Sequence, residues 1–134
     1  MNPQAPAVPA AGTKVLVIDD SNTIRRSAEI FLRQGGYDVV LAEDGFDALS
    51  KVSDHDPQLI FCDILMPRLD GYQTCAIIKR NPRFTRVPVI MLSSKDGLFD
   101  KARGRMVGSE DYLTKPFTKE QLLRAVEQYR RNGS

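Results

Sequence analysis

The chain has 134 residues, enough for one domain with a single hydrophobic core and too few for two domains of ordinary size. Hydrophobic residues make up 42% and charged residues 27% of the sequence, which is typical of globular proteins rather than disordered or membrane proteins. The net charge is only +2 and the cations are spread along the chain, so we expect no nucleic-acid partner. With no apolar run long enough to span a bilayer and no signal peptide near Met1, we expect a cytoplasmic protein without membrane insertion.

Residues 1–12 are rich in Pro and Ala and lack periodicity, which predicts a flexible tail before one domain over residues 13–132. Within that domain, short apolar runs alternate with segments of helical spacing. The runs that suit strands are residues 15–18, 39–42, 59–62, 89–92 and the shorter 112–113. Because these runs are apolar throughout, we expect parallel strands that are covered on both faces.

Five segments have apolar residues at helical spacing. In chain order, these residues are Ile24, Ala28, Phe31 and Leu32; Ala48, Leu49 and Val52; Cys75, Ile77 and Ile78; Leu98, Ala102 and Met106; and Leu122, Ala125, Val126 and Tyr129. Ser21 suits the N-cap of the first helix, and Gly35 with Gly36 suits its end. Thr118, with Gln121 three residues later, is typical of a capping box at the start of the last helix.

Alternating strands and helices predict an α/β fold of the (βα)5 type, a doubly wound five-stranded parallel sheet with helices on both faces. Ligand sites in such sheets lie beyond the carboxyl ends of the strands. Asp19 and Asp20 follow the first predicted strand, and Asp63 follows the third. Ser93 follows the fourth strand and Lys115 the fifth. We therefore expect these side chains to meet at one edge of the sheet.

Crowded carboxylates repel one another, so their ionised form requires a cation, and oxygen ligands without Cys or His suit Mg²⁺. This set permits phosphoryl transfer to Asp63 as nucleophile, with Lys115 as a second positive charge and Ser93 as a hydroxyl donor. A simpler alternative is that Asp19 and Asp20 only cap the first helix. The sequence has no glycine-rich phosphate loop, so we expect the phosphoryl donor to be a small phosphorylated molecule or another protein.

Four motifs occur in order at suitable spacing: Asp19-Asp20, Asp63 with Met66-Pro67 and Asp70-Gly71, Ser93-Ser94, and Lys115-Pro116-Phe117. With them, residues 14–131 closely resemble the receiver domains of two-component response regulators, the CheY-like family with its flavodoxin-like fold. The resemblance implies that Asp63 is the phosphoacceptor and that Lys115 pairs with the phosphoryl group. It implies that Mg²⁺ is bound by Asp19, Asp20, Asp63 and the Leu65 backbone carbonyl. It also implies a cis peptide bond between Lys115 and Pro116.

The resemblance further implies that Ser93 and Tyr112 form the switch. Phosphorylation would draw Ser93 toward the phosphoryl group, and Tyr112 would turn inward. Partner affinity would then change at the surface formed by the fourth helix, fifth strand and fifth helix. Alternatively, Tyr112 is an ordinary half-buried strand residue. Phe99 suits either a partner contact or helix packing, and the basic residues of the fourth helix suit either a solvated face or a docking surface for an acidic partner.

Residues 95–117 are similar to single-domain receivers of the PilG type, which serve chemotaxis-like systems that control type IV pili. This likeness implies phosphorylation by a CheA-like histidine kinase and an output protein linked to the pilus machinery, with twitching motility as the readout. We expect a regulator rather than an enzyme, and a monomer or weak dimer. Three alternatives are a flagellar-type chemotaxis receiver, a phosphate-independent interaction module and a haloacid-dehalogenase-like phosphatase. The last is disfavoured because the first strand ends in Asp19-Asp20-Ser21 rather than Asp-x-Asp.

Overall fold

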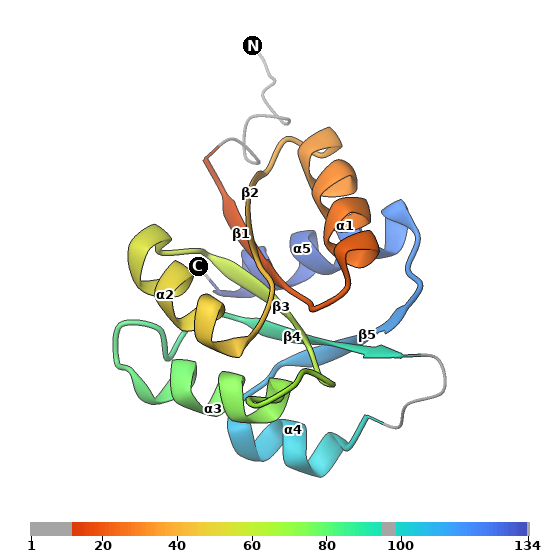
Figure 1. Ribbon diagram of the computed structural model, residues 1–134. Helices are drawn as coiled ribbons and strands as arrows, with labels where there is room; N and C mark the ends of the chain where they lie inside the picture. Colours follow the sequence, from red (N-terminus) through yellow and green to blue (C-terminus); the bar gives the residue numbers. More distant parts are fainter. Residues whose placement is uncertain (1–11, 95–98, 134) are drawn as a thin grey trace.

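The computed structural model describes residues 12–94 and 99–133, and five strands alternate with five helices along the chain (Figure 1). The strands are β1 (Lys14–Ile18), β2 (Asp38–Ala42), β3 (Leu59–Asp63), β4 (Val89–Ser94) and β5 (Asp111–Lys115). The helices are α1 (Asn22–Gln34), α2 (Gly45–His55), α3 (Gly71–Arg80), α4 (Lys101–Val107) and α5 (Lys119–Gly133). The predicted tail, residues 1–12, lies outside the described residues except for Gly12.

All five strands run parallel in one sheet, in the order β2-β1-β3-β4-β5. This order confirms the predicted doubly wound fold, because the chain first adds a strand on one side of β1 and then continues from β3 in the other direction. β1 pairs with β3 from Val15 opposite Leu59 to Ile18 opposite Cys62. The residues that follow these two central strands therefore lie side by side at the position where such sheets bind ligands.

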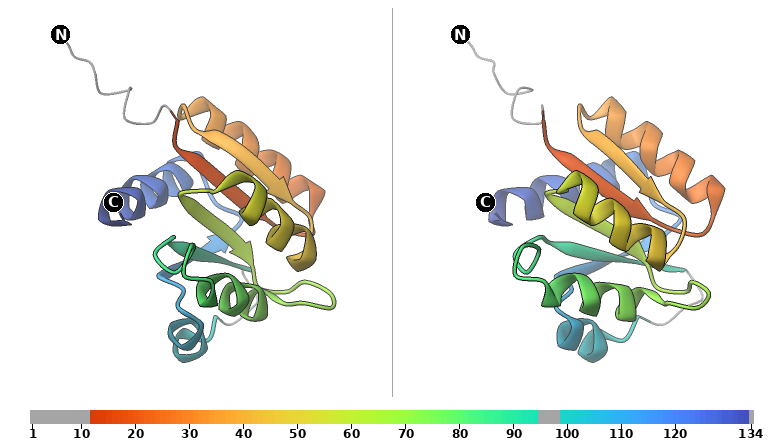
Figure 2. Two further views of the ribbon diagram at one scale, coloured as in Figure 1. Left: turned by 90° about the vertical axis from the view of Figure 1, so that its left-hand side faces the viewer. Right: turned by 60° about the vertical axis from the view of Figure 1, so that its left-hand side comes forward.

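Helices cover both faces of the sheet (Figure 2). In β1, Val15 and Val17 belong to the core under α1 and α5, whereas Leu16 and Ile18 belong to the core under α2 and α3. All four are fully buried, which explains why β1 is apolar at every position from Val15 to Ile18. Within the described ranges, no helix is both long enough and apolar enough to cross a membrane.

The predicted helix ends are confirmed at α1 and α5. The Ser21 hydroxyl accepts a hydrogen bond from the Ile24 backbone N–H at 3.3 Å, and Gly36 has the positive φ of +90° that suits the turn after α1. At α5, the Thr118 hydroxyl accepts from the Gln121 N–H at 3.1 Å, and the Gln121 side chain accepts from the Thr118 N–H at 2.9 Å. These reciprocal bonds form the predicted capping box.

The packing side of α4 differs from the prediction. Leu98 lies outside the described residues, and Met106 is 86% exposed, so the predicted apolar stripe faces solvent. The helix packs through Gly104 instead, where an added Cβ would lie 2.6 Å from the Phe99 ring. A glycine that permits close approach adds nothing to a hydropathy pattern, so the pattern indicated the wrong side. On α3, Ile77 of the predicted stripe is also 39% exposed.

The start of α3 lies directly against the end of β3. The Gly71 N–H donates to the Ile64 carbonyl oxygen at 2.8 Å. A Cβ at position 71 would overlap the Asp63 carbonyl oxygen and lie 2.8 Å from the Ile64 Cα. Gly71 therefore lets the backbone of α3 approach the strand end that carries Asp63.

We expect Gly71→Ala to lower the free energy of unfolding by about 1–3 kcal/mol, the usual cost of forcing an extra methyl group into a packed site. The matched control is Gly35→Ala, where the new methyl group meets the flexible end of the Leu123 side chain at 2.6 Å and φ is −81°. Urea unfolding followed by circular dichroism measures both variants. Equal stability of the two would contradict a close backbone approach at Gly71.

Candidate functional site

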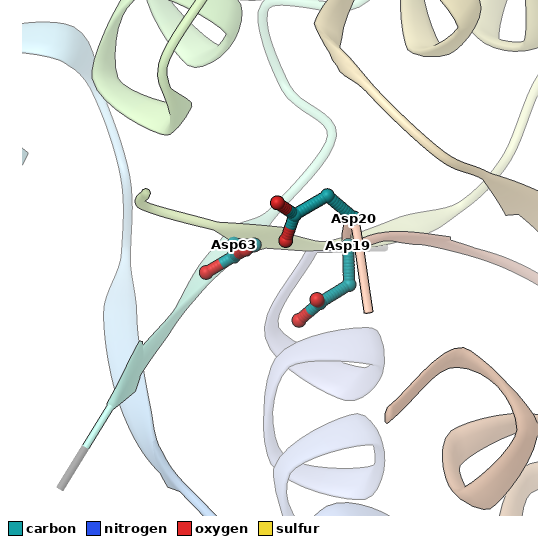
Figure 3. Close-up of side chains that lie close together, drawn as sticks. All are labelled: Asp19, Asp20 and Asp63. Atoms are coloured by element: carbon teal, nitrogen blue, oxygen red, sulfur yellow. The ribbon is translucent and has the colours of Figure 1, made fainter. Parts of the chain in front are cut away.

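The carboxyl ends of β1 and β3 bring three carboxylates together (Figure 3). Asp19 and Asp20 follow β1, Asp63 ends β3, and one carboxylate oxygen from each lies within 4.8 Å of the other two. Asp19 is 0% and Asp63 is 3% exposed, whereas Asp20 is exposed at the rim. The three acidic residues expected at this edge are therefore in one cluster.

Lys115, the last residue of β5, reaches two of these carboxylates from the far side of β4. Its Nζ donates to Asp19 Oδ2 and to Asp63 Oδ1, each at 3.0 Å. Burial by itself lowers the pKa of Lys115, but the hydrogen bond to Asp63 and the charge of Asp19 outweigh it, so this pKa is raised. The lysine therefore stays protonated at neutral pH and offsets part of the negative charge.

The charge on Asp63 is costly in this position. The pKa of Asp63 is raised to about 6: burial is the largest cause, the neighbouring charge of Asp19 adds to it, and Lys115 opposes both effects. A divalent cation beside the cluster would favour the ionised form. Hard carboxylate oxygens without a thiol or imidazole in the cluster are the ligands that Mg²⁺ prefers, so the residues fit this ion.

The alternative role of Asp19 and Asp20 as caps of the first helix is not supported. The N-cap of α1 is Ser21. Asp19 Oδ1 accepts a hydrogen bond from the Ser21 N–H at 2.8 Å, outside the helix, and Asp19 Oδ2 binds Lys115. Asp19 is therefore oriented by the turn after β1 and directed toward the cluster.

A cavity of about 200 Å³ opens beside the carboxylates. Its lining residues are Asp20, Asp63, Ile64, Leu65, Ser93, Ser94 and Lys115. Since a water molecule occupies about 30 Å³ in the liquid, the cavity has room for a phosphoryl group. The Leu65 side chain is 70% exposed at this site. The sequence pattern indicates no role for Ser94, and its place in the cavity wall identifies it as part of the site.

The structure places Tyr112 apart from both the carboxylate cluster and this cavity. Its side chain is 38% exposed. Its ring stacks on Phe99 with a centroid distance of 4.6 Å and an angle of 21° between the planes. Tyr112 therefore belongs to the surface between α4 and β5, three residues before Lys115 on the same strand. The predicted cis peptide bond between Lys115 and Pro116 is confirmed.

Comparison with known proteins agrees with this geometry. The family model of the response regulator receiver domain matches residues 15–127. Protein PilG of Pseudomonas aeruginosa is 67% identical over 116 residues, which are 87% of this chain and 86% of PilG. The alkaline phosphatase synthesis transcriptional regulatory protein PhoP of Bacillus subtilis is 38% identical over 85% of this chain and 47% of PhoP. The solved structure of the Vibrio cholerae chemotaxis protein CheY4 has a TM-score of 0.84 at 32% identity, covering 89% of this chain and 99% of that one.

We expect Asp63→Asn to raise the free energy of unfolding by about 1–3 kcal/mol at pH 7 without Mg²⁺, because one pKa unit corresponds to about 1.4 kcal/mol. Folding raises the pKa of Asp63 from its usual 3.8 to about 6, so the folded protein holds this proton more tightly than the unfolded chain. The destabilisation by ionised Asp63 is therefore complete above about pH 6 and decreases as the pH falls toward 3.8.

Thermal unfolding at pH 7 and pH 5, with and without Mg²⁺, measures this effect. The excess stability of Asp63→Asn over the wild type should be smaller at pH 5 than at pH 7. Mg²⁺ should stabilise the wild type more than Asp63→Asn. The control is Asp54→Asn, at an exposed position on α2, which should change neither comparison. If Asp63→Asn is more stable than the wild type by the same amount at both pH values, this would contradict the raised pKa of Asp63.

Proposed function

This chain belongs to the response regulator receiver family, and we propose that it is a signalling switch driven by reversible phosphorylation of Asp63 beside Mg²⁺. The observation that carries the proposal is the surroundings of the Asp63 carboxylate. It is buried among two further carboxylates and one lysine, and it borders a cavity with room for a phosphoryl group. Neither a helix cap nor a structural ion pair requires three carboxylates at one position.

In this proposal Asp63 is the nucleophile. A carboxylate oxygen of Asp63 forms a bond to phosphorus while the bond to the donor breaks, and the leaving group keeps that electron pair. Asp63 needs no general base, because it attacks as the ionised carboxylate. Asp19, Asp20, Asp63 and the Leu65 backbone carbonyl would hold Mg²⁺, which supplies charge neutralisation for the phosphoryl oxygens.

Lys115 and Ser93 would bind the remaining phosphoryl oxygens. The Lys115 ammonium already lies 3.0 Å from Asp63 Oδ1, so it can pair with new negative charge there without a large movement. Ser93 is 5% exposed in the cavity wall, and its hydroxyl would donate to another phosphoryl oxygen. Movement of Ser93 toward the phosphoryl group would then give Tyr112 space to turn inward.

The partners follow from the family and from the strong likeness to PilG. We assign phosphorylation to a CheA-like histidine kinase, and output to a protein that binds the surface of α4, β5 and α5 and controls type IV pili. Identity to PilG is 67%, against 32% to the chemotaxis protein CheY4, which favours a PilG-type role over that of a general chemotaxis receiver. We also propose a monomer or weak dimer in the cytoplasm, where free cysteines such as the buried Cys62 and Cys75 stay reduced.

Incubation with acetyl phosphate and Mg²⁺ should add about 80 Da, one phosphoryl group, to the wild type and nothing to Asp63→Asn. Intact-protein mass spectrometry measures this directly. A mass gain by both proteins would show that a residue other than Asp63 accepts the phosphoryl group. If neither gains mass, beryllofluoride binding followed by ¹⁹F NMR separates a short-lived phosphoryl group from a module that signals without phosphate.

Deleting the gene in the source bacterium should reduce twitching on surfaces, and the wild-type gene should restore it. The Asp63→Asn gene should not restore twitching, because the switch cannot be phosphorylated, whereas the control gene with Asp54→Asn should. Twitching zones on agar measure the result. Normal twitching in the deletion strain would refute the pilus role and leave the phosphorylation of Asp63 untouched.

A further inference from the structure

The connection between β3 and α3 contains a strained turn centred on Arg68. The Leu69 N–H donates to the Pro67 carbonyl oxygen at 2.7 Å, which closes a three-residue turn. Arg68 lies at its centre with a φ of +69°. A three-residue turn with a positive φ at its centre is rare and strained, and arginine does not favour the left-handed region as glycine and asparagine do. Contacts from the surrounding structure therefore hold Arg68 in this conformation.

The Arg68 side chain is bound by the start of α2. Its Nη2 lies 3.0 Å from Asp44 Oδ2, and its Cζ lies 5.3 Å from the centroid of the Phe46 ring. Asp44 is the N-cap of α2, and its other oxygen, Oδ1, accepts from the Asp47 N–H at 2.7 Å. Figure 2 shows the β3–α3 connection directly beside the start of α2. One carboxylate thus caps this helix and also binds the centre of the turn.

The residue after Arg68 packs against the same helix end. Gly45 is the first residue of α2, and a Cβ added there would lie 2.8 Å from Leu69 Cδ2 and 2.5 Å from Thr74 Oγ1. The missing side chain at Gly45 therefore lets Leu69 lie close against the α2 backbone. Arg68 and Leu69 together join the turn to the first residues of α2.

The same connection carries Leu65, which lines the cavity beside the carboxylates. Its side chain is 70% exposed, so its own packing does little to fix its position. Within the described ranges, neither the Leu65 N–H nor its carbonyl oxygen takes part in a hydrogen bond. The carbonyl is thus available to a cation. Its position depends on the buried Met66 on one side and on the Arg68 turn that follows.

The charge of Arg68 and its position would affect a cation site in opposite directions. A guanidinium three residues after Leu65 repels a divalent cation in the cavity, and this repulsion alone would make Mg²⁺ bind more tightly when Arg68 is removed. A fixed position of the Leu65 carbonyl has the reverse effect, because a ligand that is already ordered loses less conformational freedom when the ion binds. The sign of the change in affinity therefore distinguishes the two effects.

We propose that Arg68 is a positioning residue for Mg²⁺, which holds the β3–α3 connection against the start of α2 and thereby places the Leu65 carbonyl for the ion. This inference rests on the proposed function, because Mg²⁺ beside Asp63 is part of that proposal. Asp44 and Phe46 act on the ion through Arg68. The start of α2, which contributes no ligand, thus helps to determine the affinity of the site.

The direct test replaces Arg68 with asparagine. Asparagine tolerates a positive φ, so the turn keeps its backbone conformation, but its side chain is too short for both contacts of Arg68. We expect Arg68→Asn to bind Mg²⁺ about 5-fold more weakly, which corresponds to the loss of an exposed ion pair and a cation–π contact. The midpoint of urea unfolding without Mg²⁺ should not fall, because the substitution also relieves backbone strain. Amide chemical shifts of ¹⁵N-labelled protein, titrated with MgCl₂, measure the dissociation constant.

A second variant, Asp44→Asn, leaves the turn and Arg68 unchanged. Asparagine still caps α2, since it is among the preferred N-cap residues, but it lacks the charge that binds Arg68. We expect Asp44→Asn to weaken Mg²⁺ binding about 2-fold, the usual size for one exposed ion pair. In the double variant, Asp44→Asn should add nothing to the effect of Arg68→Asn, because both act through the same contact.

The matched control is Arg83→Asn at the opposite end of α2. Arg83 makes the same two kinds of contact: its Nη2 lies 2.7 Å from Asp56 Oδ2, and its Cζ lies 4.9 Å from the centroid of the Phe84 ring. Asp56 is the C-cap of α2, whereas Asp44 is its N-cap. Arg83→Asn should therefore lower the midpoint of urea unfolding and leave the dissociation constant of Mg²⁺ unchanged.

The inference would be overturned by unchanged or tighter Mg²⁺ binding in Arg68→Asn, by equal weakening in Arg83→Asn, or by fully additive effects in the double variant. Reduced stability of Arg68→Asn with unchanged Mg²⁺ binding would show that Arg68 is only structural. The same titration of the wild type and Asp63→Asn tests the proposed function separately. If the wild type binds Mg²⁺ no better than Asp63→Asn, the proposed function fails first. If it binds better and Arg68→Asn equals the wild type, only the role of Arg68 fails.

Discussion

Repulsion among carboxylates at the ends of β1 and β3 is the constraint on which the rest of this structure depends. Asp19 and Asp63 are buried side by side, and the single ammonium of Lys115 is shared between them. Burial and the charge of Asp19 raise the pKa of Asp63 to about 6 in spite of Lys115, so the site favours a proton or a cation. A fold that keeps this charge in place is sensitive to any ion or phosphoryl group that changes it.

The surrounding backbone connects that charge to the rest of the domain. Gly71 allows α3 to start directly against the Asp63 carbonyl, so the strand end and the helix are in direct backbone contact. On the far side, β5 carries both Lys115, which binds Asp63, and Tyr112, which lies on the outer surface. Lys115 and Tyr112 lie three residues apart, so this one strand joins the carboxylate cluster to the outer surface.

A groove at α4 and β5 differs from the carboxylate cavity in how its charged residues are used. It is lined by Phe99, Lys101, Arg105, Ser109, Glu110, Asp111 and Tyr112. In the cavity, the Lys115 ammonium lies 3.0 Å from carboxylate oxygens of Asp19 and Asp63, and the remaining negative charge favours the binding of a cation. In the groove, Glu110 is bound internally to Lys79, while Lys101 and Arg105 face outward. The cavity thus has the charge and the space that the proposed metal and phosphoryl group require.

The sequence by itself determined the order of elements, the buried strands, the caps at Ser21 and Thr118 and the acidic set, because these depend on short-range periodicity and on local hydrogen bonds. It also indicated which edge of the sheet carries the site, since parallel strands end together. Only the tertiary structure decided which side of α4 packs, because Gly104 adds no hydropathy signal and its close approach depends on Phe99. The stacking of Phe99 on Tyr112 and the reach of Lys115 across β4 were likewise decided in three dimensions, since they join residues whose distance is set by packing rather than by spacing along the chain.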